Sequence, residues 1–217
     1  QQSQLTDPIF YPSGYYAYFF DAAKKGYSGV AIYCKQKPCN VATGLGWDTA
    51  DAEGRYIQAD FDKLSVASLY LPSGTSGDAR QTIKYDFLDK YIEILKKQRQ
   101  MQQDIIVCGD FNIAHNNIDI KNWRSNQKNS GFLPKERAWL DLVFNDVGFV
   151  DAFRHKYPDK EQYTWWSNRA NAWDNNVGWR IDYQVITPNL AKNIVHASVF
   201  RGEKFSDHAP LTIEYRS

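Results

Sequence analysis

The 217-residue sequence has little cysteine, no long apolar run and no block of like charge. Its three cysteines, Cys34, Cys39 and Cys108, are odd in number and lack the spacing of zinc ligands, so we expect reduced thiols. No stretch approaches the roughly 20 apolar residues of a membrane-spanning helix, and the first residues do not resemble a signal peptide. Repeats and low-complexity linkers are also absent. These absences predict one soluble, cytoplasmic domain without a membrane segment.

The charges nearly cancel, with 26 Lys and Arg against 25 Asp and Glu, which gives a formal net charge of +1. A nucleic-acid partner would therefore be held by a local basic face and not by the field of the whole molecule. Aromatic residues make up 15% of the chain, so part of them can form a surface that stacks against a ligand. Candidate basic contacts, which the sequence does not place on one face, are Lys121, Arg124, Lys128 and Arg169.

Short apolar strands alternate with amphipathic helices along the chain. Apolar residues recur at helical spacing between Asp78 and Gln102, with Asp78 as the expected N-cap. The apolar run 105–108 then predicts a strand buried on both faces. Strands alternating with helices predict a layered α/β sandwich with mostly antiparallel neighbours. The other predicted elements are a helix at 134–145, strands at 15–20, 30–34, 56–61, 64–71, 163–166, 179–187 and 211–215, and a weaker strand at 196–200.

A carboxylate and an amide follow the apolar strand 105–108, in the sequence Gly109-Asp110-Phe111-Asn112. In extended chain, residues two positions apart project to the same side, so Asp110 and Asn112 are expected to face one pocket. A turn or a helix cap is the alternative role for an aspartate at a strand end. The apolar strand that precedes these residues favours the pocket.

A second polar group precedes the last predicted strand, in the sequence Ser206-Asp207-His208-Ala209-Pro210. The small flanking residues leave room for a substrate. A neutral imidazole can take a proton from water or donate a hydrogen bond to a phosphate oxygen, and an adjacent carboxylate raises its basicity and helps to hold a hard cation. An ordinary surface pair of Asp207 and His208 is the alternative.

Asp182 interrupts the apolar strand 179–187, where an unpaired carboxylate is unfavourable. Its partner is either Arg180, which projects to the same side two residues earlier, or His208, which Asp182 would orient as the carboxylate of a triad orients its imidazole. Tyr70 ends the strand 64–71 within the sequence YLPSG. It is either a core residue or a phenol that reaches a phosphate.

Four motifs in this order, YLPSG, GDFNIAH, GWRIDY and SDHAP, resemble the exonuclease III and abasic-site endonuclease branch of the endonuclease/exonuclease/phosphatase superfamily. The resemblance extends through NSGFLPKERAWLD and YTWW and covers essentially the whole chain. It implies a four-layered α/β sandwich of two packed, mostly antiparallel sheets flanked by helices. It also implies a monomeric hydrolase that uses Mg²⁺, with Mn²⁺ as the alternative metal. Such an enzyme cuts double-stranded DNA at abasic sites and 3′ ends, in the bacterial cytosol or nucleoid.

The resemblance further implies roles for single residues. His208 would be the general base or a phosphate ligand, and Asp182 would support it. Asp110 would handle the proton of the leaving oxygen, while Asn112 would position that oxygen or the attacking water. Tyr70 would contact the scissile phosphate. The metal ligands would come from Asp207, Asp110, Asn112 and His208.

Residues around GWRIDY correspond to those with which relatives enclose a flipped-out abasic sugar and push into the duplex. A sugar without a base presents an apolar edge, which an aromatic wall can enclose while it excludes a full nucleoside. Packing between the sheets is the alternative role for Trp165 and Trp166. The substrate-binding residues implied in this way are Trp165, Arg169, Trp179 and Ile181.

The sequence departs from the family pattern at its start. Relatives carry a strand with an Asn, and then a metal-binding Glu in an L-Q-E-x-K segment, upstream of the residues that resemble QQSQLTDPIFYP. We therefore expect a single domain over residues 1–217 that lacks its first strand or strands. A true fragment of this kind is expected to be unstable and nearly inactive.

Two other functions are also compatible with the sequence. One is a relative that acts on another phosphodiester, such as an inositol phosphate or a phospholipid head group, because the superfamily shares motifs like GDFN and SDH. The Trp-rich segment YTWW before GWRIDY favours DNA. The other is an inactive DNA-binding remnant, which follows from the missing glutamate.

Overall fold

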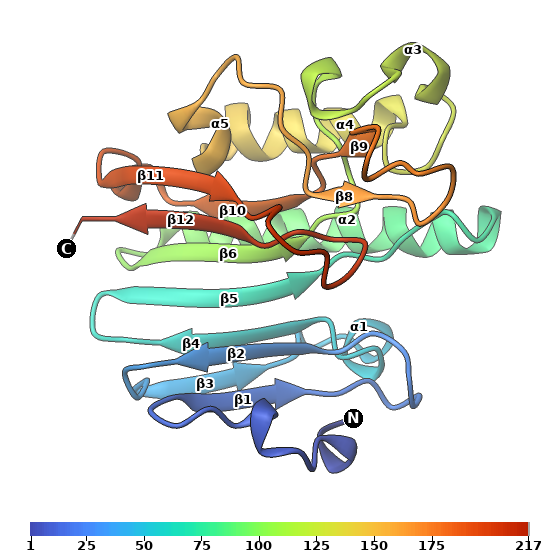
Figure 1. Cartoon of the computed structure of the whole chain (residues 1–217). Helices are drawn as coiled ribbons and strands as arrows, with labels where there is room; N and C mark the ends of the chain where they lie inside the picture. Colours follow the sequence, from blue (N-terminus) through green and yellow to red (C-terminus); the bar gives the residue numbers. More distant parts are fainter. Residues whose placement is uncertain (217) are drawn as a thin grey trace.

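The computed structural model describes residues 1–216 and is built around a six-stranded sheet (Figure 1). All neighbouring strands of this sheet are antiparallel except β5 and β6, which are parallel. The strand order is β3 (Asn40–Thr43), β4 (Tyr56–Asp60), β5 (Leu64–Tyr70), β6 (Asp104–Asp110), β10 (Asp182–Ile186) and β7 (Val150–Asp151).

Helices cover one face of this sheet. Helix α2 (Asp78–Gln100) connects β5 to β6 and turns apolar residues, among them Leu88 and Leu95, toward Leu69 of β5 and Val107 of β6. Helix α4 (Pro134–Asp141) packs in the same apolar cluster; in Figure 1, α2 runs behind β6 and α4 lies above it. The remaining helices are α1 (Asp48–Ala52), α3 (Trp123–Asn126), α5 (Ala152–Lys156) and α6 (Pro188–Ala191).

Two-stranded sheets pack against the rest of the molecule through separate apolar clusters. In one cluster Ile32 of β2 packs with Ile57 of β4, and in another Ile194 of β11 packs with Ile186 of β10. Together with the helices they make the predicted layered α/β sandwich, which is confirmed. The two-stranded sheets are β1 (Tyr16–Phe20) with β2 (Val30–Cys34), β11 (Ile194–Val199) with β12 (Leu211–Tyr215), and β8 (Trp165–Trp166) with β9 (Gly178–Trp179).

The ends of three strands converge at one edge of the six-stranded sheet. Because β5 and β6 are parallel, their carboxyl ends lie side by side, with Tyr70 opposite Asp110. Because β10 is antiparallel to β6, its first residue, Asp182, is also opposite Asp110. The topology therefore gathers the polar residues of three separate motifs.

Several predicted boundaries were wrong. Helix α2 starts at Asp78 itself, and its N-cap is Gly77, whose φ of 106° is a conformation that favours glycine. The helix predicted at 134–145 leaves α-helical geometry at Asp141 and continues as a π-helical turn, Leu142–Asp146. The strand predicted at 179–187 is split into β9 and β10, and the strand predicted at 163–166 keeps only Trp165 and Trp166.

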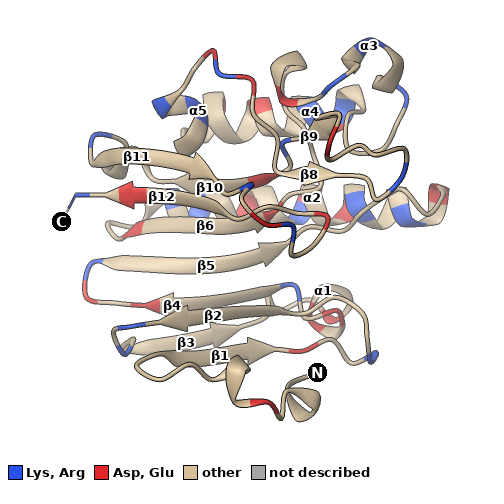
Figure 2. Ribbon diagram, viewed as in Figure 1, with Lys and Arg blue, Asp and Glu red and all other residues tan. Residues whose placement is uncertain are grey.

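Charged residues lie mostly on helices and loops, whereas the strands are nearly free of them (Figure 2). Within residues 1–216, no helix is both long and apolar enough to cross a membrane. The three cysteines form no disulfide, and Cys34 is buried whereas Cys39 is exposed.

Candidate active site

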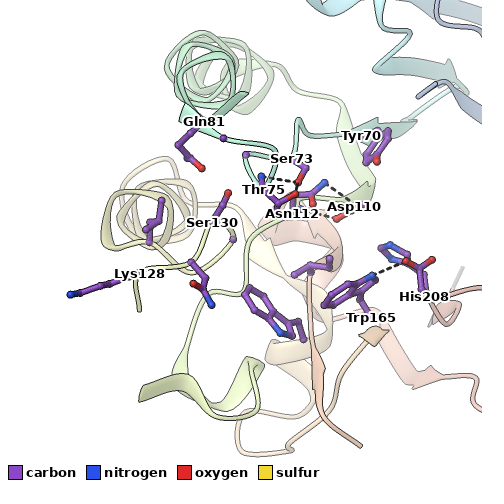
Figure 3. Close-up of a pocket in the computed structure, with 18 of the residues that line it drawn as sticks. Tyr70, Ser73, Thr75, Gln81, Asp110, Asn112, Lys128, Ser130, Trp165 and His208 are labelled. Atoms are coloured by element: carbon purple, nitrogen blue, oxygen red, sulfur yellow. Dashed lines mark hydrogen bonds between the residues drawn. The ribbon is translucent and has the colours of Figure 1, made fainter. Parts of the chain in front are cut away.

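A cavity of about 660 Å³ opens where β5, β6 and the ribbon of β8 and β9 end. Figure 3 shows Tyr70, Asp110, Asn112 and His208 gathered around it. The cavity brings together eight of the residues predicted from the sequence, namely Tyr70, Asp110, Asn112, Trp165, Trp179, Ile181, Asp207 and His208. The other residues that line it are Ser73, Gly74, Thr75, Gly77, Asp78, Gln81, Lys128, Asn129, Ser130, Gly131 and Leu133.

Asp110 and Asn112 form a closed pair at the end of β6. The backbone N–H of Asn112 donates to Oδ1 of Asp110 at 2.7 Å, and its side-chain Nδ2 donates to Oδ2 of Asp110 at 3.0 Å and to the carbonyl of Leu71 at 2.9 Å. Asn112 has a φ of 51°, so the chain is no longer extended there, and the pairing arises from a turn and not from strand alternation. Because Nδ2 is engaged within the protein, the amide oxygen is the atom that Asn112 can offer to a ligand.

Asp182 supports His208 from behind the cavity wall. Nδ1 of His208 lies 2.9 Å from Oδ2 and 3.1 Å from Oδ1 of Asp182. Arg180, the other partner that the sequence suggested for Asp182, does not pair with it. Arg180 pairs instead with Asp119 at 2.8 Å and with Asp151 at 2.7 Å. The strand break between β9 and β10 is the physical reason, since Arg180 and Asp182 no longer alternate along one extended strand.

These contacts raise the pKa values of two groups, which favours the neutral form of the carboxyl and the charged form of the imidazole. Burial, and then the negative charge of Asp182, raises the pKa of Asp110 to about 7. Burial on its own lowers the pKa of His208, but the hydrogen bond and charge of Asp182 outweigh it and raise the pKa to about 9. Near neutral pH, His208 therefore carries a proton, and Asp110 can either hold or release one.

Aromatic rings close the cavity beside these polar groups. Nε1 of Trp165 donates to Oδ2 of Asp207 at 3.0 Å, and the Trp165 ring meets Trp179 edge to face at 6.0 Å. Trp166 is fully buried and packs against Trp173, so of the two roles considered for it, Trp166 has the packing role. Trp165, in contrast, forms part of the cavity wall.

The predicted basic contacts do not share one face of this cavity. Lys128 lines it, whereas Lys121 and Arg124 line a separate cavity of about 630 Å³. Arg169 is exposed and is not part of either wall. Of the four basic candidates, only Lys128 therefore lies at the site described here.

A model of the endonuclease/exonuclease/phosphatase family matches residues 1–208. The chain belongs to this family. An exodeoxyribonuclease of Bacillus subtilis is 40% identical over 203 residues, which are 93% of this chain and 80% of that protein. The DNA repair nuclease APEX1 of Danio rerio is 38% identical over 216 residues, 97% of this chain and 67% of that protein. The structure of an AP endonuclease from Archaeoglobus fulgidus matches with a TM-score of 0.89 and 28% identity, covering 99% of this chain and 84% of that one.

These relatives assign the chain to the exonuclease III and abasic-site endonuclease branch of the family, as its motifs predicted. The resemblance of the motifs to this branch implies a divalent metal. In the described part of the chain, residues 1–216, no three His, Cys, Asp or Glu side chains form a metal cage. Mg²⁺ is commonly held by one or two carboxylates together with water and substrate phosphates. Asp207 lines the cavity, as does Asp110, so the cavity offers carboxylate oxygens to an ion bound in this way.

Tyr70 is held by Arg55, a residue that no sequence motif singles out. The guanidinium of Arg55 lies 5.0 Å from the centre of the Tyr70 ring, and its NH1 donates to the Tyr70 carbonyl at 2.8 Å. Arg55 is itself 2% exposed and paired with Glu53 at 2.6 Å. Arg55 stands 15 residues before Tyr70, and no local pattern links the two.

Proposed function

We propose that this chain is a DNA-repair phosphodiesterase, which hydrolyses the backbone of duplex DNA at abasic sites and at 3′ ends with a divalent cation, Mg²⁺ first and Mn²⁺ as the alternative. The observation that carries the proposal is the single cavity in which Asp110, Asn112, His208 and Tyr70 meet, beside a wall of tryptophans. Two relatives named exodeoxyribonuclease and DNA repair nuclease support DNA as the substrate.

The protein's own groups divide the chemistry between them. Protonated His208, held by Asp182, donates a hydrogen bond to a phosphoryl oxygen and so favours the charge that builds there. Asp110, with a pKa of about 7, takes a proton from the attacking water or gives one to the leaving oxygen. Asn112 positions that oxygen or the water, and the phenol of Tyr70 contacts the scissile phosphate.

Asp207 would hold the metal, which leaves Asp110 for proton transfer. A divalent cation bound there supplies positive charge to the phosphoryl oxygens and the leaving group. Trp165 keeps Asp207 in place through its indole N–H, so the carboxylate is oriented before a ligand arrives. Oδ1 of Asp207 would then be the oxygen left for a cation.

Trp165, Trp179 and Ile181 would enclose the flipped-out abasic sugar. The three side chains line the same cavity as His208, and the edge-to-face packing of the two indoles fixes the shape of the wall. A sugar without a base fits an apolar wall of this kind better than a full nucleoside does. Selectivity for abasic sites would follow from the size of this enclosure.

The decisive experiment incubates the protein with Mg²⁺ and a duplex that carries one abasic-site analogue, with an undamaged duplex as the control. We expect incision beside the analogue and slow removal of nucleotides from 3′ ends. Release of phosphate from an inositol phosphate without any incision would overturn the choice of substrate. Binding of the duplex without incision would instead support the inactive DNA-binding alternative.

The same assay tests the residue roles. Asp110→Asn is expected to lower turnover by about 10² or more, because a proton-transfer group contributes at least that much. An Asp110→Asn protein that turns over at the rate of the unchanged protein would remove Asp110 from the mechanism.

A further inference from the structure

A lysine and a glutamate form a fully buried ion pair beneath the cavity. Nζ of Lys84, on α2, lies 2.6 Å from Oε1 of Glu136, on α4, and both residues are 0% exposed. Removing one partner of such a pair is strongly destabilising, yet replacing both by apolar residues is often neutral. Stability alone therefore does not account for two charges at this place.

Lys84 reaches from this pair to the catalytic turn. Its Nζ donates a hydrogen bond to the backbone carbonyl of Asn112 at 2.8 Å. Asn112 is held in a left-handed conformation, and its N–H and Nδ2 groups both bind Asp110. A shift of the Asn112 carbonyl would thus move the amide that positions Asp110.

Glu136 reaches from the same pair to another part of the cavity wall, the segment 128–133. Its Oε2 accepts hydrogen bonds from the backbone N–H groups of Gly131 at 2.7 Å and Leu133 at 3.0 Å. Its Oε1 accepts hydrogen bonds from Nε2 of Gln81 at 3.0 Å and from Oγ of Ser130 at 3.3 Å. One carboxylate therefore fastens the wall segment 128–133 to helix α2.

The two sides held by the pair also touch each other. Gly131 has a φ of 92°, and a Cβ at this position would lie 3.1 Å from the carbonyl oxygen of Asn112 and 3.0 Å from Cζ3 of Trp179. The wall segment therefore packs directly on the carbonyl that Lys84 binds and on one ring of the tryptophan wall. Lys84 and Glu136 stand at the junction of these parts.

We propose that Lys84 and Glu136 are positioning residues that hold the wall segment 128–133 in register with Asn112 and Asp110. The inference rests on the proposed function, since it concerns the same cavity. Lys84 acts on the reacting groups through Asn112, so its loss lowers kcat. Glu136 acts on the part of the cavity wall that would contact DNA, so its loss raises KM. A role in stability alone gives no such split.

The test compares Lys84→Met, Glu136→Gln and the double variant Lys84→Met/Glu136→Gln on an abasic duplex with Mg²⁺. The double variant removes both charges, so its melting temperature returns toward that of the unchanged protein. We expect its kcat to stay at least about tenfold low, because small displacements of reacting groups reduce rates strongly. Lys90→Met, on the same helix but in an exposed pair with Asp86, is the matched control.

Two outcomes overturn the inference. One is a double variant with restored melting temperature and unchanged kcat and KM. The other is unchanged amide hydrogen exchange in Glu136→Gln, because loss of Glu136 must speed exchange of the Gly131 and Leu133 N–H groups. If the unchanged protein does not incise DNA at all, the proposed function has failed, and the exchange measurement still tests the positioning role. Unchanged exchange at both amides would refute the positioning role.

Discussion

At the scale of single residues, the protonation of His208 depends on Asp182. The two side chains are 2.9 Å apart, and the pKa of His208 is raised to about 9. The folded-state pKa lies above the ordinary value of about 6.5. The stability gained from this pair is therefore fully present below about pH 6.5 and is lost as the pH rises through about 9.

Asp182→Asn is expected to lower the pKa of His208 toward or below its ordinary value, because the hydrogen bond to a charged partner and its Coulomb attraction are both removed. NMR of the imidazole ¹H and ¹⁵N nuclei over a pH series would measure the midpoint. Incision should fall by about 10² or more at neutral pH if the protonated imidazole takes part. A midpoint that does not move on substitution would contradict the assigned contact.

Asp119 is the second residue with a clear pH signature. It is fully buried, and although burial alone raises its pKa, the charges and hydrogen bonds of Arg180 and Arg154 outweigh this and lower it to about 2. A depressed carboxylate pKa contributes stability above about pH 3.9, and that contribution is lost as the pH falls through about 2. The shift of nearly two pKa units corresponds to about 2 to 3 kcal/mol of unfolding free energy.

Asp119→Asn should therefore reduce the free energy of unfolding at pH 7 by about 3 to 5 kcal/mol, since it leaves buried Arg180 without one of its partners. Urea unfolding at pH 7 and at pH 3 would measure it, with a smaller difference between the two proteins at pH 3. Asp89→Asn, in an exposed pair with Lys135, is the control and should change stability by about 1 kcal/mol at most. Equal effects of the two substitutions would contradict the assigned network.

At the scale of elements, the sequence predicted what local periodicity determines. Helix α2 and strand β6 follow from apolar spacing, and Asp110 and His208 were found because polar motifs sit at strand ends. The break between β9 and β10 was not predictable, because Arg180 is drawn out of the strand by Asp119, 61 residues away. Lys84 was missed for a similar reason, since a lysine within a helix pattern indicates a solvent-exposed position until its partner 52 residues later is known.

The close approach of β5 and β6 depends on Gly109. Its φ is 150°, and a Cβ there would lie 1.8 Å from the carbonyl oxygen of Leu69. Gly109→Ala should therefore push the two strands apart, lower the free energy of unfolding by several kcal/mol and reduce incision, because Tyr70 and Asp110 would separate. Thermal unfolding and the abasic-duplex assay measure both effects.

Gly46→Ala is the matched control for this substitution. Gly46 also has a positive φ, 80°, but an added Cβ would have no atom within 4 Å. Its expected cost is only about 1 to 2 kcal/mol from the strained backbone, with no change in incision. If the two alanine variants behaved alike, steric conflict between the strands would not be the cause.

At the scale of the whole molecule, a net charge of +1 leaves DNA binding to local contacts. Lys128 is the basic residue in the wall of the cavity, whereas Lys121 lines another cavity and is paired with Glu161 at 3.2 Å. Lys128→Ala should weaken binding of an abasic duplex and reduce the slope of log affinity against log salt by about 1, because one phosphate contact is lost. Lys121→Ala should change the slope less, since its charge is already partly neutralised. Fluorescence anisotropy over a salt series measures both slopes, and a larger loss for Lys121→Ala would shift the DNA path toward the second cavity.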